Sequence, residues 1–406
     1  MDDADIAEMV SWITEAGLAG WSETAALGGF CERAVAFGLP LARANVVIDT
    51  LHPVYEGRAF TWKRQQKETA LSEFGRSPEM LDRWERSPFY RLEVSGETLL
   101  RRKLTAATET EFPILAELRA DGITDYMAVA NRFSSEGIIG DMDCVYSSWA
   151  TDAPQGFREA DVAALSGLMP SFALAMKSAS LARVAETLVE TYLGRDAGRR
   201  VLEGRIARGI ADRIEAVLWF SDLRSYTRIS DSAAPEQIIP LLNDYAEAII
   251  SAIHAQGGDV LKLMGDGILA IFTAGDPGRA CHTALRAASS ARRAVAAVNQ
   301  RRAEKSLPTT DMYLGLHVGE VFYGNIGSRE RLDFTVVGPA VNEVSRIAGM
   351  CRSLDQPLLI SSAFASAIGE PKKQFVSVGR YALRGVGRPQ DLYTLDNDAG
   401  ALFEES

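Results

Sequence analysis

One tight turn carries a carboxylate between two apolar runs. Gly265-Asp266-Gly267 separates DVLKLM from ILAIF within residues 259–272. A glycine-containing two-residue turn between apolar runs predicts a β-hairpin, and this one would hold Asp266 at its tip. Asp222 follows the apolar run 216–220 (AVLWF), which we interpret as a buried strand. A hairpin tip beside a strand end can place two carboxylates together, and two suffice for Mg²⁺ when substrate phosphates supply further ligands.

Each of these aspartates also has an ordinary structural interpretation. Asp266 alone is typical of a turn residue, because aspartate tolerates a positive φ. Asp222 alone is typical of the N-cap of a following helix. These alternatives stay open until other motifs are considered.

The second half of the chain alternates strands and helices. We predict helices over 235–256, 279–304 and from residue 339, and strands over 216–220, 312–318 and 321–325, besides the hairpin. This order predicts an α/β (α+β) sandwich with a mixed sheet flanked by helices, which we assign to residues 211–406.

Residues 1–178 have the pattern of a separate α/β or α+β domain. Helices are expected over 8–37, and strands over 44–50, 57–63, 123–133 and 140–149, the last two joined by a turn at 134–137 (SSEG). A closing helix over 158–176 has Val162, Leu165, Leu168, Phe172 and Met176 on one face. A sheet with helices at both ends is typical of a sensor domain.

Residues 179–210 are expected to form a helical linker. Leu181, Val184, Leu188 and Tyr192 follow a three-four spacing over about two heptads. The helix can pair with its copy in a dimeric coiled coil, or it can lie on one of its own domains.

The net charge and the positions of the cysteines restrict the partners and the compartment that we expect. The net charge of -11 argues against nucleic acid or an anionic membrane as the main partner. The four cysteines are scattered, which favours reduced thiols in a cytoplasmic protein. The acidic start lacks the features of a signal peptide, and charged residues interrupt the most apolar windows. We therefore expect a cytoplasmic protein without a membrane span.

Three motifs in order resemble the class III adenylate and guanylate cyclases. They are FSDLRSYT at 220–227, KLMGDG at 262–267 and VNEVSR at 341–346, and the resemblance covers about 213–395. Agreement of three motifs in order and spacing is more specific than any one of them. The resemblance implies cyclisation of ATP to cyclic AMP. Guanylate cyclisation and a catalytically silent nucleotide-binding module that signals by dimerising are the alternatives.

The resemblance also implies a role for individual residues. Asp222 and Asp266 match the ligands of two Mg²⁺ or Mn²⁺ ions, and Lys262 and Thr335 match the residues that read the purine. Asn342 and Arg346, one helical turn apart, match the pair that orients substrate and stabilises charge in the transition state. Because the family takes the two halves of its site from two subunits, a single chain carrying both implies a homodimer.

Other residues are candidates for binding the triphosphate. Backbone amides after Asp222 can hold phosphate oxygens, which makes Leu223, Ser225 and Thr227 candidates. Arg384 and Arg388 can supply a cation to the triphosphate.

Residues 1–178 resemble a GAF-like sensor domain by their order of elements. The resemblance implies an unidentified small-molecule effector that regulates the cyclase by changing how its halves meet. His52, the domain's only histidine, is a candidate haem ligand, but we prefer to interpret it as a hydrogen-bonded residue at a strand end.

Overall fold

The chain folds as two compact units, Met1–Leu188 and Val189–Ser406. The computed structural model describes residues 1–104, 111–133, 139–369 and 374–395. The turn expected at 134–137 lies outside these residues. Both units combine helices with a β-sheet, as the sequence predicts, and the sheet of the second unit is mixed.

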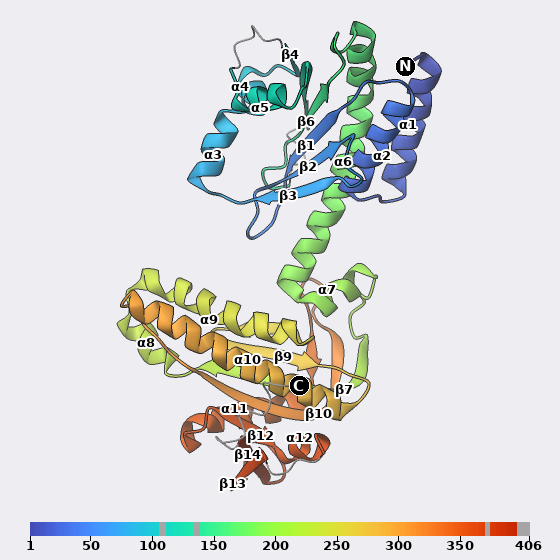
Figure 1. The fold of residues 1–406 in the computed structure, drawn as a ribbon. Coiled ribbons are helices and arrows are strands. Elements are labelled where there is room, and N and C mark those ends of the chain that lie inside the picture. The colour runs from blue at the N-terminus through green and yellow to red at the C-terminus, as the bar shows by residue number, and fades with distance from the viewer. Residues whose placement is uncertain (105–110, 134–138, 370–373, 396–406) are drawn as a thin grey trace. The chain divides into compact units, whose positions relative to one another are not determined.

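The first unit is built on a six-stranded sheet with the order β3-β2-β1-β6-β5-β4 (Figure 1). Every neighbouring pair in it is antiparallel. The strands are β1 (Arg43–Asp49), β2 (Gly57–Lys63), β3 (Ala70–Phe74), β4 (Leu99–Lys103), β5 (Asp125–Arg132) and β6 (Cys144–Thr151). The helices are α1 (Asp3–Leu18), α2 (Glu23–Ala36), α3 (Pro78–Glu85), α4 (Pro88–Ser95), α5 (Pro113–Ala120) and α6 (Glu159–Leu193).

Strand alternation divides the residues of β1 between two faces of this sheet. Ala44, Val46 and Ile48 belong to the core that α1, α2 and α6 complete on one face. Val47 belongs to a second core, with residues of α4 and α5. Because successive strand residues point to opposite faces, Asn45 lies on the same face as Val47. This face lines a large cavity.

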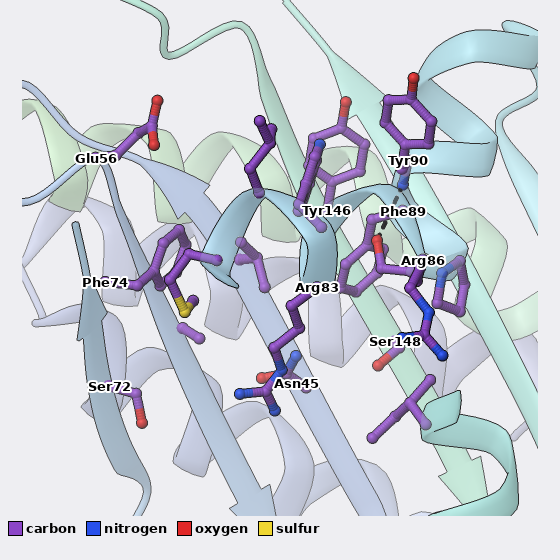
Figure 2. A pocket seen from close by; sticks show the side chains of 18 of the residues that line it. Asn45, Glu56, Ser72, Phe74, Arg83, Arg86, Phe89, Tyr90, Tyr146 and Ser148 are labelled. Carbon is purple, nitrogen blue, oxygen red and sulfur yellow. Dashed lines mark hydrogen bonds between the residues drawn. The ribbon is translucent and has the colours of Figure 1, made fainter. Parts of the chain in front are cut away.

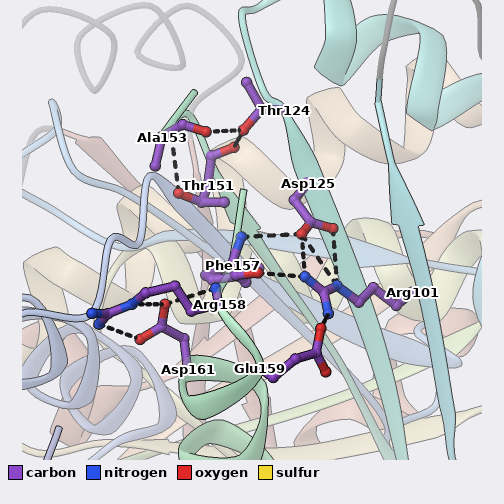
Figure 3. A network of polar contacts seen from close by, with 9 residues as sticks. All are labelled: Arg101, Thr124, Asp125, Thr151, Ala153, Phe157, Arg158, Glu159 and Asp161. Carbon is purple, nitrogen blue, oxygen red and sulfur yellow. Dashed lines mark hydrogen bonds and ion pairs between the residues drawn. The ribbon is translucent and has the colours of Figure 1, made fainter. Parts of the chain in front are cut away.

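A buried polar network joins strands β4 and β5 to the start of α6 (Figure 3). Asp125 of β5 is fully buried, and its carboxylate accepts hydrogen bonds from the Arg101 guanidinium and from the Phe157 backbone N–H. The Asp161 side chain accepts the backbone N–H of Arg158 at 2.9 Å and caps the helix. The network therefore satisfies a buried charge and sets where α6 begins.

The helix α6 is continuous to Leu193, whereas the sequence predicted a closing helix and a separate linker helix. The predicted core face is confirmed for Leu165, Leu168, Phe172 and Met176, which are all buried. Leu181 packs against the same core, so the first part of the linker lies on its own domain. Pro170 sits within the helix without ending it.

By length and composition, α6 is also the one helix among the described residues that would suit a membrane crossing. The buried core helices of globular domains meet the same criterion, and this helix contributes side chains to such a core.

The second unit is built on an eight-stranded sheet with the order β13-β14-β12-β10-β7-β9-β8, and β11 pairs with β10. The pair β10–β12 is parallel, which makes the sheet mixed. The strands are β7 (Ala211–Leu223), β8 (Asp259–Met264), β9 (Gly267–Phe272), β10 (Met312–Gly327), β11 (Leu332–Val337), β12 (Leu358–Ser361), β13 (Phe375–Tyr381) and β14 (Gln390–Leu395). The helices are α7 (Arg195–Leu202), α8 (Tyr226–Ser232), α9 (Pro235–Ala255), α10 (Pro277–Glu304), α11 (Pro339–Leu354) and α12 (Ser362–Ala367).

Both faces of the central strand β7 are covered. Val217 and Trp219 belong to the core that α9 and α10 complete, while Ala216 and Leu218 belong to a core that includes α7 and α11. A strand buried on both faces reads as a continuous apolar run, and 216–220 has this pattern. Figure 1 shows α9 and α10 lying along one side of the sheet.

Two strand predictions in this unit need correction. Residues 312–318 and 321–325 form the single strand β10 rather than two strands. Gly319 lies within this strand, and the close approach of Ala340 leaves no space for a side chain there. The strand β7 extends to Leu223, so Asp222 is the last but one residue of the strand and does not follow it.

Candidate active site

Asp222 and Asp266 lie together, as predicted. The Asp266 carboxylate accepts the backbone N–H of Leu223 at 3.2 Å, which holds the hairpin tip beside the end of β7. Burial, followed by the charge of Asp266, raises the pKa of Asp222 to about 6. The Oδ1 atom of Asp222 is buried and has no hydrogen-bond partner among the described residues. A cation is the partner that such a paired, desolvated carboxylate lacks.

The two carboxylates suit a Mg²⁺ or Mn²⁺ ion that takes its other ligands from a polyphosphate. They do not form a complete metal site made of protein ligands alone. Among the described residues no group of three or more His, Cys, Asp or Glu side chains could hold a metal. Mg²⁺ usually takes one or two carboxylates, with water and substrate phosphates completing its shell. Asp222 and Asp266 would be those two ligands.

Lys262 lies on β8 and forms an ion pair with Asp333 of β11. Sequence reasoning missed Asp333. A signal was present, because Asp333 stands two residues before Thr335 in the strand pattern LDFTVV, and alternate strand residues share a face. Phe334 and Val336 are buried, so Asp333 and Thr335 lie on the opposite face of β11. Lys262 is therefore paired with a residue that was not predicted, and that residue shares a face of β11 with Thr335.

Asn342 and Arg346 lie on the exposed side of α11. Pro339 occupies the first turn of this helix, as predicted, and Val344 and Ala348 are buried against β10. Because residues four apart share a helical face, Asn342 and Arg346 project together away from the sheet. Asn342 lines a hollow of about 590 Å³ between the start of α11 and the segment Gly385–Gly387.

Two buried polar residues support the start of α11. His317 of β10 contacts the Ser361 hydroxyl at 2.8 Å through Nδ1, and its Nε2 lies 3.5 Å from the Glu343 carboxylate. Burial lowers the pKa of His317 to about 4, so the ring is neutral near pH 7. Burial also raises the pKa of Glu343. The neutral ring of His317 thus contacts the carboxyl group of Glu343, the residue that follows Asn342 in the sequence.

Asn342 and Arg346 are not bonded to the aspartate pair within one chain. Both are exposed on α11, and among the described residues no hydrogen bond or ion pair joins either of them to Asp222 or Asp266. The helix runs back along β10, since Ala340 packs on Gly319 while Val344 approaches Gly315.

The predicted phosphate-binding segment after Asp222 needs partial correction. The N–H of Leu223 is already used by Asp266, and the N–H of Arg224 donates to the Asp311 carbonyl at 2.7 Å. Ser225 has a left-handed backbone with φ 59°, and Thr227 is exposed in the first turn of the short helix α8. The alternative role of Asp222 as an N-cap is wrong, because Ser225 occupies that position.

The remaining candidates lie apart from the aspartate pair. Arg384 and Arg388 are exposed and flank the segment that lines the hollow beside Asn342, but they do not line it themselves. In the first unit, His52 Nδ1 accepts the backbone N–H groups of Val54 and Tyr55 at 3.1 and 3.2 Å. These contacts make His52 the closing residue of a turn, which is the interpretation that we preferred.

Comparison with known proteins identifies those to which this chain is similar. Residues 211–397 match the family model described as the adenylate and guanylate cyclase catalytic domain. Adenylate cyclase 1 of Rhizobium meliloti is 26% identical over 305 residues, which are 74% of this chain and 42% of that protein. The adenylate cyclase of Anabaena cylindrica is 31% identical over 164 residues, 40% of this chain and 33% of that protein. The matches thus span less than half of each relative.

Solved structures of two cyclases are also similar. The crystal structure of the guanylyl cyclase Cya2 is 29% identical, with a TM-score of 0.41, and covers 46% of this chain and 93% of that chain. The crystal structure of the adenylyl cyclase CyaB from P. aeruginosa is 24% identical, with a TM-score of 0.43, and covers 46% and 96%.

Proposed function

Because residues 211–397 belong to the adenylate and guanylate cyclase catalytic-domain family, we propose that this chain converts ATP into 3′,5′-cyclic AMP and pyrophosphate. The observation that carries the proposal is the pair Asp222 and Asp266, with a buried carboxylate oxygen that has no partner among the described residues. A silent module has no need to keep such a costly pair.

The reaction is an in-line displacement at phosphorus. The ribose 3′-oxygen bonds to the α-phosphorus while the bond to pyrophosphate breaks, and the hydroxyl proton is released. Two divalent ions, when bound, would lower the pKa of this hydroxyl and neutralise the triphosphate. Asp222 and Asp266 would hold these ions, while Asn342 orients the substrate and Arg346 stabilises charge on the phosphoryl oxygens.

Lys262 supports ATP as the substrate. Its ammonium group has three N–H donors, so it can keep its ion pair with Asp333 and still donate to adenine N1. The Thr335 hydroxyl, on the same face of β11 as Asp333, can accept from the adenine 6-amino group. Asp333 would keep Lys262 charged and point it at the base.

Asp333 also favours a second candidate, cyclisation of GTP. Guanine has an acceptor at O6 beside donors at N1 and N2. Lys262 can donate to O6 and the Asp333 carboxylate can accept from N1, if both side chains turn to the base together. We place ATP first because the Asp333 carboxylate already accepts from Lys262.

A site shared between two subunits implies that the protein acts as a dimer. Asn342 and Arg346 are exposed, and no hydrogen bond or ion pair joins them to Asp222 or Asp266 among the described residues. This supports a homodimer in which the metal-binding half of one subunit meets the Asn/Arg half of the other. We further propose that the first unit is a GAF-like regulatory domain that binds a small-molecule effector, and that the protein acts in the cytoplasm.

The test is a product assay on the purified full chain. ATP or GTP is supplied with Mg²⁺ or Mn²⁺, and cyclic nucleotide is measured by chromatography. We expect cyclic AMP, with at least about a hundredfold loss in Asp266→Asn, because one metal ligand is removed. Asp231→Asn is the matched control, because Asp231 is exposed on α8. Cyclic GMP alone would favour the second candidate, and no product from either triphosphate would favour the silent module.

A further inference from the structure

The first unit contains a cavity of about 1780 Å³ on the sheet face opposite α1, α2 and α6. Strands β1, β2, β5 and β6 form its floor, and α3 and α4 form a wall. Figure 2 shows polar side chains from the floor and from α3 facing the same space. A volume of this size accommodates a small organic molecule and water.

Arg43 lines this cavity with a buried guanidinium nitrogen that has no partner in the part of the chain that the structure describes. Its Nε atom is buried and has no hydrogen-bond partner, and no ion pair is found for it among the described residues. Its charge acts on the phenol of Tyr126, which also lines the cavity. A guanidinium N–H group withdrawn from water without an acceptor costs folding free energy. An anion bound in the cavity would remove this cost.

On the strands, the cavity-lining neighbours of Arg43 are groups without negative charge, while Glu117 of α5 also lines the cavity. In the sheet register Asn45 lies directly between Thr61 and Ser148. The Thr61 hydroxyl donates to the Asn45 side-chain oxygen at 3.0 Å, which leaves the Asn45 amide N–H groups as donors. Figure 2 shows Arg83 pointing from α3 toward Asn45. This end of the cavity therefore combines the guanidinium groups of Arg43 and Arg83 with the amide donors of Asn45.

An aromatic wall adjoins this cluster. Tyr146 contacts Trp84 edge to face, with ring centroids 5.3 Å apart, and Phe89 at 5.6 Å. All three rings line the cavity beside Val47. Aromatic faces and edges of this kind bind a planar ring well.

The opposite end of the cavity is acidic. Asp49 lies six residues after Arg43 on β1, about 20 Å along the strand. Burial, followed by the charge of Asp143, raises the pKa of Asp49 to about 7, and Glu56 and Asp141 add to the shift. The paired arginine at this end, Arg76, is already bound to Glu56 and Asp141. A second anionic group would meet like charge there, so the cavity disfavours a polyanion.

We propose that this cavity binds an organic monoanion with an aromatic ring, such as an arylcarboxylate. The anionic group lies against Arg43 and Asn45, and the ring lies against Tyr146 and Phe89. This site is separate from the cyclase site, and its occupation does not depend on the reaction proposed there.

Binding is tested on the full chain with matched probes. Phenylacetate and indole-3-acetate are the anions, phenylacetamide is the neutral analogue and phenethylamine is the cation. Each is titrated up to about 10 mM and followed by calorimetry and by thermal unfolding. We expect the carboxylates to release or absorb heat and to raise the melting temperature, and the neutral and cationic analogues to bind at least about tenfold more weakly, because only an anion pairs with Arg43.

Two variants assign the effect to Arg43. Arg43→Gln is expected to weaken carboxylate binding about tenfold or more, while the ligand-free variant melts no lower than the parent, because an unpaired charge has been removed. Lys63→Gln is the control, since Lys63 lies directly opposite Arg43 in the register but does not line the cavity. Absence of carboxylate binding, equal binding of the neutral or cationic probe, or full affinity in Arg43→Gln would each overturn the proposal.

Discussion

At the scale of single residues, the most informative group is the Asp222 carboxylate. An acid whose pKa is raised on folding stabilises the fold at low pH, and this stability is lost as pH rises through the folded pKa. With a folded value of about 6, ionised Asp222 costs the metal-free protein at most roughly 3 kcal/mol at pH 8, and solvent screening of the partly exposed side chain lowers this cost. At pH 5 the cost is about half of this, because the folded state keeps the proton.

Asp222→Asn should therefore stabilise the metal-free protein in a pH-dependent way. In EDTA at pH 8 we expect its free energy of unfolding to rise by about 1–3 kcal/mol, and at pH 5 by about half as much. Denaturant unfolding at both pH values measures this. Asp231→Asn, which changes an exposed carboxylate, should stay within about 0.5 kcal/mol. An equal effect of Asp222→Asn at both pH values would contradict the raised pKa.

Asp333 is the second informative residue, because it distinguishes the two substrates. If it positions Lys262 for adenine, Asp333→Asn should lower kcat/KM for ATP by about 3- to 30-fold, since an amide still accepts a hydrogen bond but lacks the charge. If it reads guanine itself, any activity with GTP should fall by more than the activity with ATP. Steady-state kinetics with both triphosphates separate these outcomes, and an unchanged kcat/KM for both would exclude either role.

At the scale of elements, the passage from α6 to α7 is held by a close backbone approach to the active-site hairpin. Gly194 has φ +88°, and a Cβ atom there would lie 2.4 Å from the Val260 carbonyl oxygen on β8. Val260 precedes Lys262 by two residues, and the pairing of β8 with β9 shifts register between them. Gly194, which follows the end of α6, thus contacts the strand that carries Lys262.

A glycine pair tests this contact. Gly194→Ala should destabilise the second unit by about 2–4 kcal/mol, from left-handed strain plus displacement of α7 from β8. Gly204→Ala is the control, because Gly204 has φ +90° and open space around it, so only about 1–2 kcal/mol of strain is expected. Chemical denaturation measures both. Equal losses would show that the contact with Val260 contributes nothing.

At the scale of the whole molecule, the proposed site is shared between two chains. We expect Asp222→Ala and Arg346→Ala each to be inactive alone, and a mixture of the two to recover part of the activity, because one site of the heterodimer keeps both intact halves. Two affinity tags allow the heterodimer to be purified and assayed for cyclic nucleotide. An inactive heterodimer of confirmed composition would contradict the shared site.

Much of this protein could be predicted from local patterns. The hairpin around Asp266 follows from glycines at a two-residue turn, the buried strand before Asp222 from a continuous apolar run, and the start of α11 from Pro339. The core face of α6 follows from helical spacing around Leu165 and Phe172. Such features depend on residues near in sequence, so sequence alone determined them.

Contacts between distant segments were decided only by the tertiary structure. Lys262 and Asp333 are 71 residues apart, and no local pattern pairs them. Whether the Arg43 guanidinium finds a partner depends on the side chains of β5, β6 and α3 that surround it. In the sequence, Gly319 stands between the two strands that were predicted. In the structure, Ala340 of α11 packs on Gly319, and the two segments form the single strand β10. In each case the determining term is a contact between residues remote in sequence, which no local propensity contains.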